Sequence, residues 1–267
     1  MRVVIVGVGG LGSALAKSVL QSGVAPSHLL LVDRRAAEIG ATADLQGCRI
    51  EDRVPQDDRL CSGDLLVLAV KPQDADLACA SVHQVLMPDV AVVSVMAGIS
   101  VARLGALLGH SKIVRAMPNL GAAVGESATV YFASPEVDPE ACLSVERFLC
   151  SIGRAWRVQD ERLVDAATAV AGSGPAYICW LAEQMEGVAR ELGISEHEAG
   201  AVVLQTLKAT CSYLENSGQS FAELRTRVTS PGGTTAAALT LLEQCDASAI
   251  MQDAIRAAFR RARELGQ

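Results

Sequence analysis

Residues 5–23 of the chain read IVGVGGLGSALAKSVLQSG, and this segment indicates the class of fold. Its glycines at positions 7, 9 and 12 have the GxGxxG spacing, follow a run of β-branched residues and open a helical pattern. In a strand–turn–helix unit of this kind, Gly7 makes the tight turn and Gly9 lets backbone N–H groups approach a pyrophosphate. Gly12 allows the helix to pack closely on the sheet, and the helix N-terminus faces the phosphates. The spacing predicts a dinucleotide site at Gly7, Gly9, Gly10, Leu11 and Gly12.

An acidic residue ends the next predicted strand. Asp33 follows Gly12 by 21 residues, close to the separation at which such a residue contacts the adenosine ribose. Asp33 would accept a hydrogen bond from the ribose 2′-OH of NADH, whereas Arg34 and Arg35 would pair with the 2′-phosphate of NADPH if Asp33 turned away. The alternatives are a tight turn without a ligand and a solvated charge cluster. The sequence favours a dinucleotide and leaves NADPH and NADH both open.

The first half of the chain alternates short apolar runs with helical patterns. Six runs are predicted strands, over 2–7, 28–33, 64–70, 90–95, 112–117 and 128–133. Several of them are apolar at consecutive positions, which is typical of parallel strands that are covered on both faces. Helices are predicted between strands, for example over 10–22 and 75–86. This alternation predicts an α/β fold with a Rossmann-type, doubly wound parallel sheet.

The second half has a different pattern. From about residue 161 the strand patterns end, and helices are predicted over 161–192, 196–216, 220–227, 234–244 and 247–265. We therefore expect a nucleotide-binding domain over 1–158 and an all-helical domain over 159–267. The predicted helix 196–216 is apolar on more than one face. It is expected either to lie in the centre of its domain or to pack against a second subunit.

The composition argues against several classes of function. A chain of 267 residues has the length of about two domains, and its net charge of −7 is a poor match for nucleic acid or an anionic membrane surface. The longest uncharged stretch, 166–182, has 17 residues and is broken by GSGP, so no membrane span is predicted. Met1 is followed at once by a predicted strand. This leaves no room for a signal peptide and predicts a cytoplasmic protein.

The cysteines are not arranged for a metal site. The eight of them stand at positions 48, 61, 79, 142, 150, 179, 211 and 245, with no CxxC pair and no pattern that joins them to the four histidines. This excludes the usual zinc spacings, so no metal is expected. We interpret each cysteine as a small, reduced core residue and expect none of them to be catalytic.

Three strand ends form a candidate wall of the ligand crevice. They read AVKPQ at 69–73, MAGIS at 96–100 and RAMPN at 115–119, and the carboxyl ends of strands in such sheets face the ligand. A lysine after an apolar strand is, on its own, more often a solvated strand end. Because three consecutive strands end in small or turn-forming residues, we interpret them as one surface. The cofactor is expected to contact Ala69, Val70, Lys71, Pro72, Ala97, Gly98 and Asn119.

The stretch RVTSPGGTTAAAL, residues 227–239, ends one predicted helix and starts another. Pro231 stops the first helix, and the two glycines after it leave backbone N–H groups uncovered by side chains. A bare turn at a helix N-terminus is an anion site. The alternative is that Thr234 or Thr235 caps the new helix, a role that threonine often has.

Several motifs occur in order along the whole chain. They are GVGGLG at 7–12, VKPQ at 70–73, AGI at 97–99, RAMPN at 115–119, AGSGPAY at 171–177 and VTSPGGTT at 228–235. Together they resemble the pyrroline-5-carboxylate reductase family, and the last two motifs are the specific ones. The resemblance implies NAD(P)H-dependent reduction of Δ1-pyrroline-5-carboxylate to L-proline, the last step of proline biosynthesis. It also implies a Rossmann domain with a helical domain that interlocks two subunits, a homodimer often found within a larger ring such as a decamer.

The same resemblance implies roles in a substrate site. The loop implied to hold the substrate carboxylate carries Ser230, Gly232, Gly233, Thr234 and Thr235. Thr235 is implied to hydrogen-bond the ring nitrogen of the imine and to supply its proton, directly or through water. Gly174 and Pro175 are implied to shape the pocket floor beside the nicotinamide.

The chain departs from the family pattern at two places. The family usually continues MPN with Thr-Pro, whereas this chain has Leu120 and Gly121. The trio Asp33, Arg34 and Arg35 also differs from the Asn-Arg or serine-rich strand ends that are common in members preferring NADPH.

Two rival functions make different predictions from the same residues. A β-hydroxyacid-type dehydrogenase would carry a lysine four residues after Gly174 as its acid/base, and this chain has Ile178 there. A non-catalytic NAD(P)-sensing regulator would have no use for an anion loop at 230–235. Both rivals predict that the chain does not turn over pyrroline-5-carboxylate.

Overall fold

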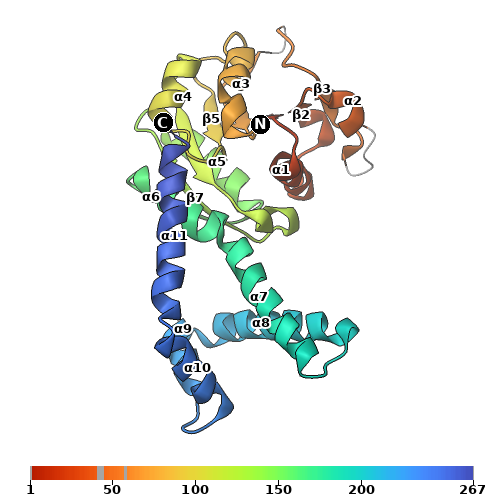
Figure 1. Ribbon diagram of the computed structural model, residues 1–267. Helices are drawn as coiled ribbons and strands as arrows, with labels where there is room; N and C mark the ends of the chain where they lie inside the picture. Colours follow the sequence, from red (N-terminus) through yellow and green to blue (C-terminus); the bar gives the residue numbers. More distant parts are fainter. Residues whose placement is uncertain (1, 41–44, 57–58, 267) are drawn as a thin grey trace. The chain divides into compact units, whose positions relative to one another are not determined.

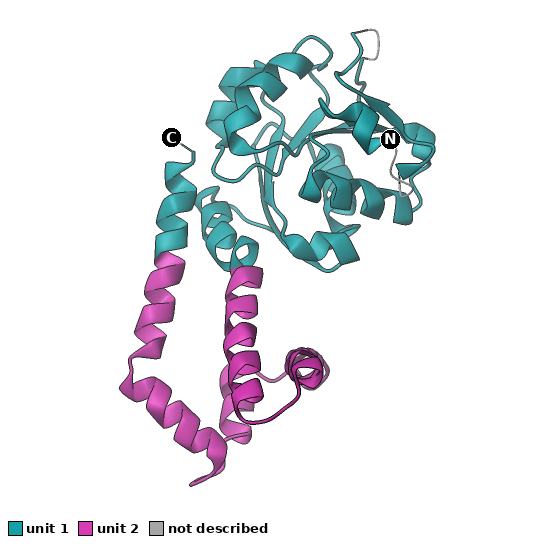
Figure 2. Ribbon diagram, turned by 45° about the vertical axis from the view of Figure 1, so that its right-hand side comes forward, with its two compact units in different colours: residues 1–173, 257–267 teal, residues 174–256 magenta. Residues whose placement is uncertain are grey.

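The structure is a computed structural model that describes residues 2–40, 45–56 and 59–266. The chain divides into two compact units, one formed by 1–173 with 257–267 and the other by 174–256 (Figure 2). Strands and helices alternate through most of the first unit, and the second is built from helices (Figure 1). Over the described ranges, none of the helices combines the length and the apolar character needed to cross a bilayer.

Among the described residues, eight strands form one sheet in the order β3-β2-β1-β4-β5-β6-β7-β8. The strands are β1 Val3–Val6, β2 Leu29–Val32, β3 Arg49–Glu51, β4 Leu65–Leu68, β5 Ala91–Ser94, β6 Ile113–Met117, β7 Ser127–Ala133 and β8 Gly153–Arg157. From β3 to β6 every pair of neighbours is parallel. All residues of β1, β2, β4 and β5 are buried, as their consecutive apolar residues predict. The Rossmann-type fold class is confirmed.

Strand β7 runs antiparallel to β6, so the prediction of an entirely parallel sheet is wrong at this strand. Residues 118–126 connect the two strands, which is shorter than the dozen or more residues that a crossover to a parallel strand requires. Burial alternates along β7, while β8 pairs with it in parallel. The sequence pattern also missed β3 and β8, because neither contains a run of apolar residues.

Helices cover both faces of the sheet, and each face has its own buried core. The helices and turns of this region are α1 Gly10–Gln21, η1 Pro26–His28, α2 Ala36–Ile39, η3 Pro72–Asp74, α3 Ala75–Val82, α4 Val101–Leu108, η4 Leu120–Val124 and α5 Pro139–Cys150. Residues of α1 and α5, such as Leu15 and Phe148, pack on one face of the sheet. Residues of α3 and α4, such as Val82 and Leu104, pack on the other. This is the doubly wound arrangement that the sequence predicts.

The helical part differs from the prediction at its start, where 161–192 was expected to be one helix. Its elements are α6 Arg162–Ala167, the π-helical turn η5 Thr168–Gly172, α7 Gly174–Glu191, α8 Glu196–Ser217, α9 Phe221–Arg227, α10 Thr234–Gln244 and α11 Ala247–Glu264. The Thr168 hydroxyl donates to the Val164 carbonyl at 2.8 Å, and the Ser173 N–H donates five residues back to the Thr168 carbonyl at 2.9 Å. The second bond spans five residues and marks a π turn, a feature often found at functional sites. The other predicted helices are present.

Helix α8 keeps much of its apolar surface uncovered within the single chain. Only Ala199 and Val203 are buried among its residues, whereas Val202 is 50% and Leu204 is 67% exposed. A place in the centre of its own unit, one of the two alternatives for this helix, is therefore not what the structure shows. The remaining alternative is a second subunit.

The expectation that every cysteine is a core residue is wrong. All eight are free thiols, but only Cys79 is buried, and five are exposed. Three of the exposed ones, Cys179, Cys211 and Cys245, lie in or next to helices of the unit 174–256, whose apolar faces are uncovered in the single chain. The composition of a segment does not reveal which of its faces another molecule covers.

Candidate functional site

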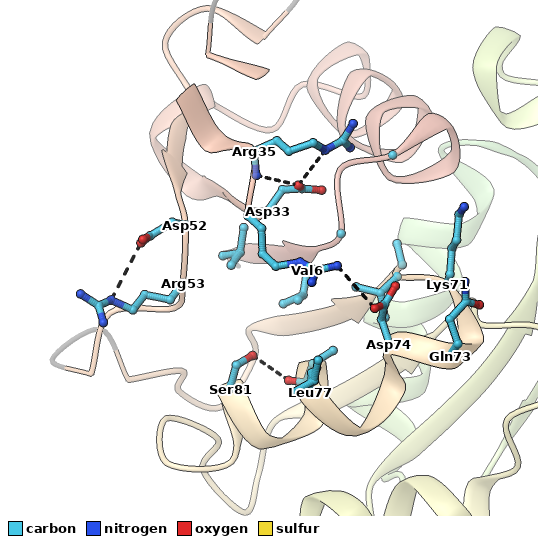
Figure 3. Close-up of a pocket in the computed structure, with 17 residues that line it drawn as sticks. Val6, Asp33, Arg35, Asp52, Arg53, Lys71, Gln73, Asp74, Leu77 and Ser81 are labelled. Atoms are coloured by element: carbon cyan, nitrogen blue, oxygen red, sulfur yellow. Dashed lines mark hydrogen bonds and ion pairs between the residues drawn. The ribbon is translucent and has the colours of Figure 1, made fainter. Parts of the chain in front are cut away.

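A cavity of about 700 Å³ lies along the carboxyl ends of β1, β2 and β4 (Figure 3). Its lining includes these predicted cofactor residues: Gly7, Gly9, Asp33, Arg34, Ala69, Val70 and Lys71. The other predicted cofactor residues are outside its lining: Gly10, Leu11, Gly12, Pro72, Ala97, Gly98 and Asn119. The structure thus brings the glycine loop, the end of β2 and the end of β4 together at one cavity.

The glycine loop has the close approaches that its spacing predicts. Gly7 has φ +95°, and a Cβ there would lie 2.7 Å from the backbone nitrogen of Val70. A Cβ on Gly12 would lie 1.9 Å from the Gly7 carbonyl oxygen, so a side chain at Gly12 would force helix α1 away from the sheet. At Gly9 a Cβ would meet nothing within 4 Å. The backbone there is open to a ligand, and α1 starts directly after it without a side-chain cap.

Asp33 is tied into this loop. One carboxylate oxygen accepts from the Val8 N–H at 2.8 Å. The other accepts from the backbone N–H and the Nε of Arg35, at 3.0 and 3.3 Å (Figure 3). Burial raises the pKa of Asp33, but the hydrogen bonds from Arg35 and Val8 outweigh it and hold the pKa below its ordinary value. Asp33 is therefore ionised at neutral pH and fixed in orientation.

Three arginines, Arg34, Arg35 and Arg53, line the same cavity as Asp33. Arg34 is 78% exposed and its nearest carboxylate partner is Asp74, at 3.4 Å. Arg53 pairs loosely with Asp52 at 3.8 Å, and in Figure 3 this pair lies on the other side of Asp33 from Lys71. Paired, exposed arginines of this kind can exchange a carboxylate for a phosphate without a large desolvation cost.

The cavity is also lined by residues that were not predicted as cofactor contacts, among them Asp52, Arg53, Gln73 and Asp74. The first two follow β3, which is only three residues long, so the pattern showed no strand end at which to place them. A signal was present in the run Glu51–Arg53, a charged cluster directly after an apolar residue. The last two belong to the turn η3 after Lys71.

The ends of β5 and β6 make contacts of a different kind. Gly98 has φ +79°, and a Cβ there would lie 2.8 Å from the Ala262 carbonyl oxygen, at the C-terminal end of α11. Asn119 accepts from the Gly121 N–H at 3.0 Å and donates to the Ala171 carbonyl of the π turn at 3.1 Å. These two residues join the strand ends to neighbouring segments.

The predicted anion loop belongs to the unit 174–256. Gly232 has φ +71°, a conformation that favours glycine. Gly233 is the N-cap of α10, and its N–H donates to the Ser230 carbonyl at 3.0 Å. Thr234 is the first residue of the helix, so the alternative that Thr234 or Thr235 caps it is wrong. No side chain caps the N-terminus of α10, which leaves its backbone N–H groups available to an anion.

The remaining predicted substrate residues lie where a helix starts. Gly174 is the first residue of α7 and is separated from the π turn by Ser173, and Pro175 is the second residue of the helix. Proline is favoured in the first turn because its missing N–H would have no partner there. A Cβ on Gly174 would meet nothing within 4 Å, so its backbone is open on that side.

Comparison with known proteins gives matches along the whole chain. Residues 161–265 match a family model described as pyrroline-5-carboxylate reductase dimerisation, and residues 2–98 match one described as NADP oxidoreductase coenzyme F420-dependent. The chain is 34% identical over 248 residues to pyrroline-5-carboxylate reductase 2 of Bacillus subtilis (strain 168), a match that covers 91% of this chain and 87% of that protein.

Solved structures agree with these matches. The structure of a pyrroline-5-carboxylate reductase from Coxiella burnetii is similar with a TM-score of 0.89 at 28% identity, covering 100% of this chain and 98% of that one. The Plasmodium falciparum pyrroline carboxylate reductase with NADP bound has a TM-score of 0.86 at 25% identity, with the same coverage.

Proposed function

Because the chain belongs to the pyrroline-5-carboxylate reductase family, we propose that it reduces Δ1-pyrroline-5-carboxylate to L-proline with NADPH or NADH, the last step of proline biosynthesis. The observation that carries this function is the pairing, in one chain, of an open glycine loop beside a cavity with a bare helix N-terminus at 230–235. The first suits a dinucleotide and the second suits a carboxylate.

The residues around the cavity fit the phosphates and ribose of a dinucleotide. The uncapped N-terminus of α1 offers backbone N–H groups, Asp33 offers an acceptor and Arg34 offers a cation. When bound, the reduced nicotinamide supplies a hydride. The proposed cofactor contacts are Gly7, Gly9, Gly10, Leu11, Gly12, Asp33, Arg34, Ala69, Val70, Lys71, Pro72, Ala97, Gly98 and Asn119.

The proposed substrate contacts have few ionisable groups, which suits this reaction. A protonated cyclic imine is already electrophilic at its C=N carbon, so the protein has to position it more than to activate it. The N–H groups at the start of α10 and the Ser230 hydroxyl bind the carboxylate, and Thr235 hydrogen-bonds the ring nitrogen. Gly232, Gly233 and Thr234 complete the loop, with Gly174 and Pro175 at the pocket floor.

We assign nucleotide binding to residues 1–158 and substrate binding and dimerisation to residues 159–267. The dimerisation model that matches 161–265 and the exposed apolar residues of α8 support a homodimer formed by the helices. A ring of dimers, such as a decamer, is the larger assembly that the family resemblance implies. The net charge of −7 argues against nucleic-acid or anionic membrane partners. The proposed location is the cytoplasm.

One assay separates this function from its rivals. The purified protein is mixed with pyrroline-5-carboxylate and either NADPH or NADH, and the loss of absorbance of the reduced nicotinamide is followed. A reductase consumes the cofactor only when substrate is present. A protein that binds NADPH without turnover is a sensor, and one that oxidises a β-hydroxyacid with NADP⁺ is a dehydrogenase. Sedimentation of the same sample gives the assembly, and a monomer would refute the proposed dimer.

A further inference from the structure

A buried arginine lies near the end of strand β6. The Arg115 side chain is only 3% exposed, and its guanidinium pairs with two carboxylates. One Nη donates to Glu161 at 3.2 Å and the other donates to Asp165. A buried ion pair of this kind adds little net stability over a well-packed apolar group. Its presence calls for a reason other than stability.

The three charged side chains connect strand β6, helix α6 and the start of helix α4. Arg115 stands two residues before the end of β6, and Asp165 is in α6, three residues before the π turn. The carboxylate of Glu161 also accepts from the N–H of Val101 at 2.8 Å, the first residue of α4. Val101 follows the loop that contains Gly98. The cluster therefore ties the ends of β5 and β6 to the approach of the π turn.

A second set of contacts also joins the end of β6 to the π turn. Asn119, after the end of β6, donates to the Ala171 carbonyl in the π turn at 3.1 Å. A Cβ on Gly172 would lie 2.8 Å from Cε of Met117, so the π turn packs closely on the strand end. After this turn the chain passes through Ser173 to Gly174 and Pro175, the first residues of α7. Movement of α6 would therefore displace both the π turn and the β6 loop that contacts it.

We propose that Arg115, Glu161 and Asp165 form a positioning cluster that holds the strand-end loops of β5 and β6 in register with the π turn, and thereby orients the proposed cofactor contacts Ala97, Gly98 and Asn119 for hydride transfer. This proposal rests on the proposed reductase function. Arginine suits the role because its planar fork fixes the direction of two carboxylates at once, which the flexible ammonium of lysine does not. None of the three charged residues needs to touch substrate or cofactor.

The cluster is expected to affect the rate of hydride transfer and not the affinity for the cofactor, because none of its residues lines the cavity at the glycine loop and Asp33. Arg115→Lys keeps the charge and loses the fork. It is expected to lower kcat by about 10- to 100-fold, since a misplacement of about 1 Å costs up to about 100-fold in rate. The Kd for NADPH and the KM for the imine should change by less than about threefold, because the cluster touches neither the glycine loop and Asp33 nor the anion loop at 230–235.

A matched control is present at the other end of the same strand. Lys112 directly precedes β6 and pairs with Asp138 at 2.9 Å and with Asp89 at 3.2 Å. Lys112→Gln removes an ion-pair network from β6 without touching the loops of the crevice. It should change the melting temperature but leave kcat within about twofold of the wild type, as expected for a surface-pair loss.

The test compares wild type, Arg115→Lys, Glu161→Gln and Lys112→Gln. Wild-type turnover is measured first, so that a failure of the proposed function is seen separately. Amide hydrogen exchange is then measured on the cofactor-free proteins, over segments 96–101, 117–121 and 168–173. Faster exchange in these segments, together with a lower kcat and an unchanged Kd, is expected in the Arg115 and Glu161 variants alone.

Two results would overturn the proposal. One is wild-type kcat in a folded Arg115→Lys or Glu161→Gln protein. The other is an equal loss of kcat in Lys112→Gln, which would show a general effect of stability. If Arg115→Lys does not fold, Glu161→Gln decides, because Glu161 is 27% exposed and the amide keeps an acceptor for Val101.

Discussion

The carboxylate of Asp33 accepts a hydrogen bond from the backbone N–H of Val8, 2.8 Å away, between the first two glycines of the cofactor loop. The residue at the position of the ribose contact therefore also supports the loop that approaches the phosphates. Its second oxygen is held by Arg35. A change at Asp33 should act on the binding of the whole dinucleotide, and not only on the choice between NADPH and NADH.

Asp33→Ala is expected to raise the Kd of both NADPH and NADH by about 10-fold or more, because an unpaired loop N–H costs about 1–3 kcal/mol. Fluorescence titration of each reduced cofactor measures this. Asp52→Ala is the control, since Asp52 lines the same cavity but, within the described residues, its ion pair is the loose one with Arg53. Tighter NADPH binding by Asp33→Ala would show that Asp33 only opposes the 2′-phosphate.

The lowered pKa of Asp33 predicts a dependence of stability on pH. A carboxyl whose pKa is lower in the folded state stabilises that state at pH values above its ordinary pKa of 3.8. This contribution is lost as the pH falls through the folded-state pKa. The difference in unfolding free energy between wild type and Asp33→Asn should therefore be constant from pH 7 to about pH 5 and shrink below about pH 4. Urea unfolding at several pH values tests this, and a difference that persists unchanged at the lowest pH contradicts it.

Arg34 is the expected discriminator between the cofactors. Arg34→Ala should weaken NADPH binding and leave NADH binding nearly unchanged, because only NADPH carries the 2′-phosphate. Asp74→Ala should have the opposite effect, a gain of a few-fold for NADPH, since it removes the competing partner of an exposed arginine. Steady-state kinetics with both cofactors measures the two shifts. Equal losses with NADPH and NADH in Arg34→Ala would remove this residue from the specificity site.

Thr235 is the residue on which the proposed proton transfer depends. Its hydrogen bond to the imine nitrogen strengthens as the nitrogen gains a lone pair, so Thr235→Ala should lower kcat by roughly 10- to 1000-fold. Thr235→Ser keeps the hydroxyl and should be mild, and Ser230→Ala should act mainly on KM. Gly233 is the N-cap of α10, so Thr235→Ala should change stability by less than about 0.5 kcal/mol. A fully active Thr235→Ala enzyme would leave the anion loop in place but take the proton-donor role from this residue.

The thiols are expected to be dispensable for catalysis. Each single Cys→Ser variant that folds should keep turnover within a few-fold, and a loss of about 100-fold in a folded variant would overturn this. Burial, with a smaller contribution from Asp76, raises the pKa of Cys79 to about 11, against an opposing effect of Arg103. Cys79 is thus a neutral thiol at pH 7. A thiol reagent should label it only after unfolding, whereas exposed Cys61 should react in the native protein.

The pattern of apolar residues within a segment predicts the strands that are covered on both faces of the sheet. It does not predict features that depend on how segments are connected, such as the direction of a strand. Strands β1, β2 and β4 are apolar throughout, and β5 is apolar except for Ser94, so the sequence of each strand is enough to predict it. The direction of β7 depends on the short connection from β6, and no residue within β7 encodes it. The π turn at 168–172 is closed by a backbone bond from the Ser173 N–H to the Thr168 carbonyl, and its sequence is that of an ordinary helix.

The cofactor loop could be predicted from the sequence, but the hydrogen bond from Val8 to Asp33 that supports it could not. The GxGxxG spacing places Gly7 and Gly12 because each needs the absence of a side chain. The orientation of Asp33 depends on Val8, which the motif does not specify. Arg115 left a signal that sequence analysis did not use, since a charge inside an apolar strand requires a partner elsewhere. The partners, Glu161 and Asp165, lie too far along the chain for periodicity to connect them.

The two open edges of the sheet, β3 and β8, carry arginines in exposed positions: Arg49 on the first, and Arg154 and Arg157 on the second. Unpaired strand edges are the usual starting points of aggregation, and like charges along an edge discourage it. Two copies that tried to continue the sheet through β8 would bring their own arginines against each other. At high concentration the protein should therefore resist fibre formation through its sheet, so self-association is directed to the helices.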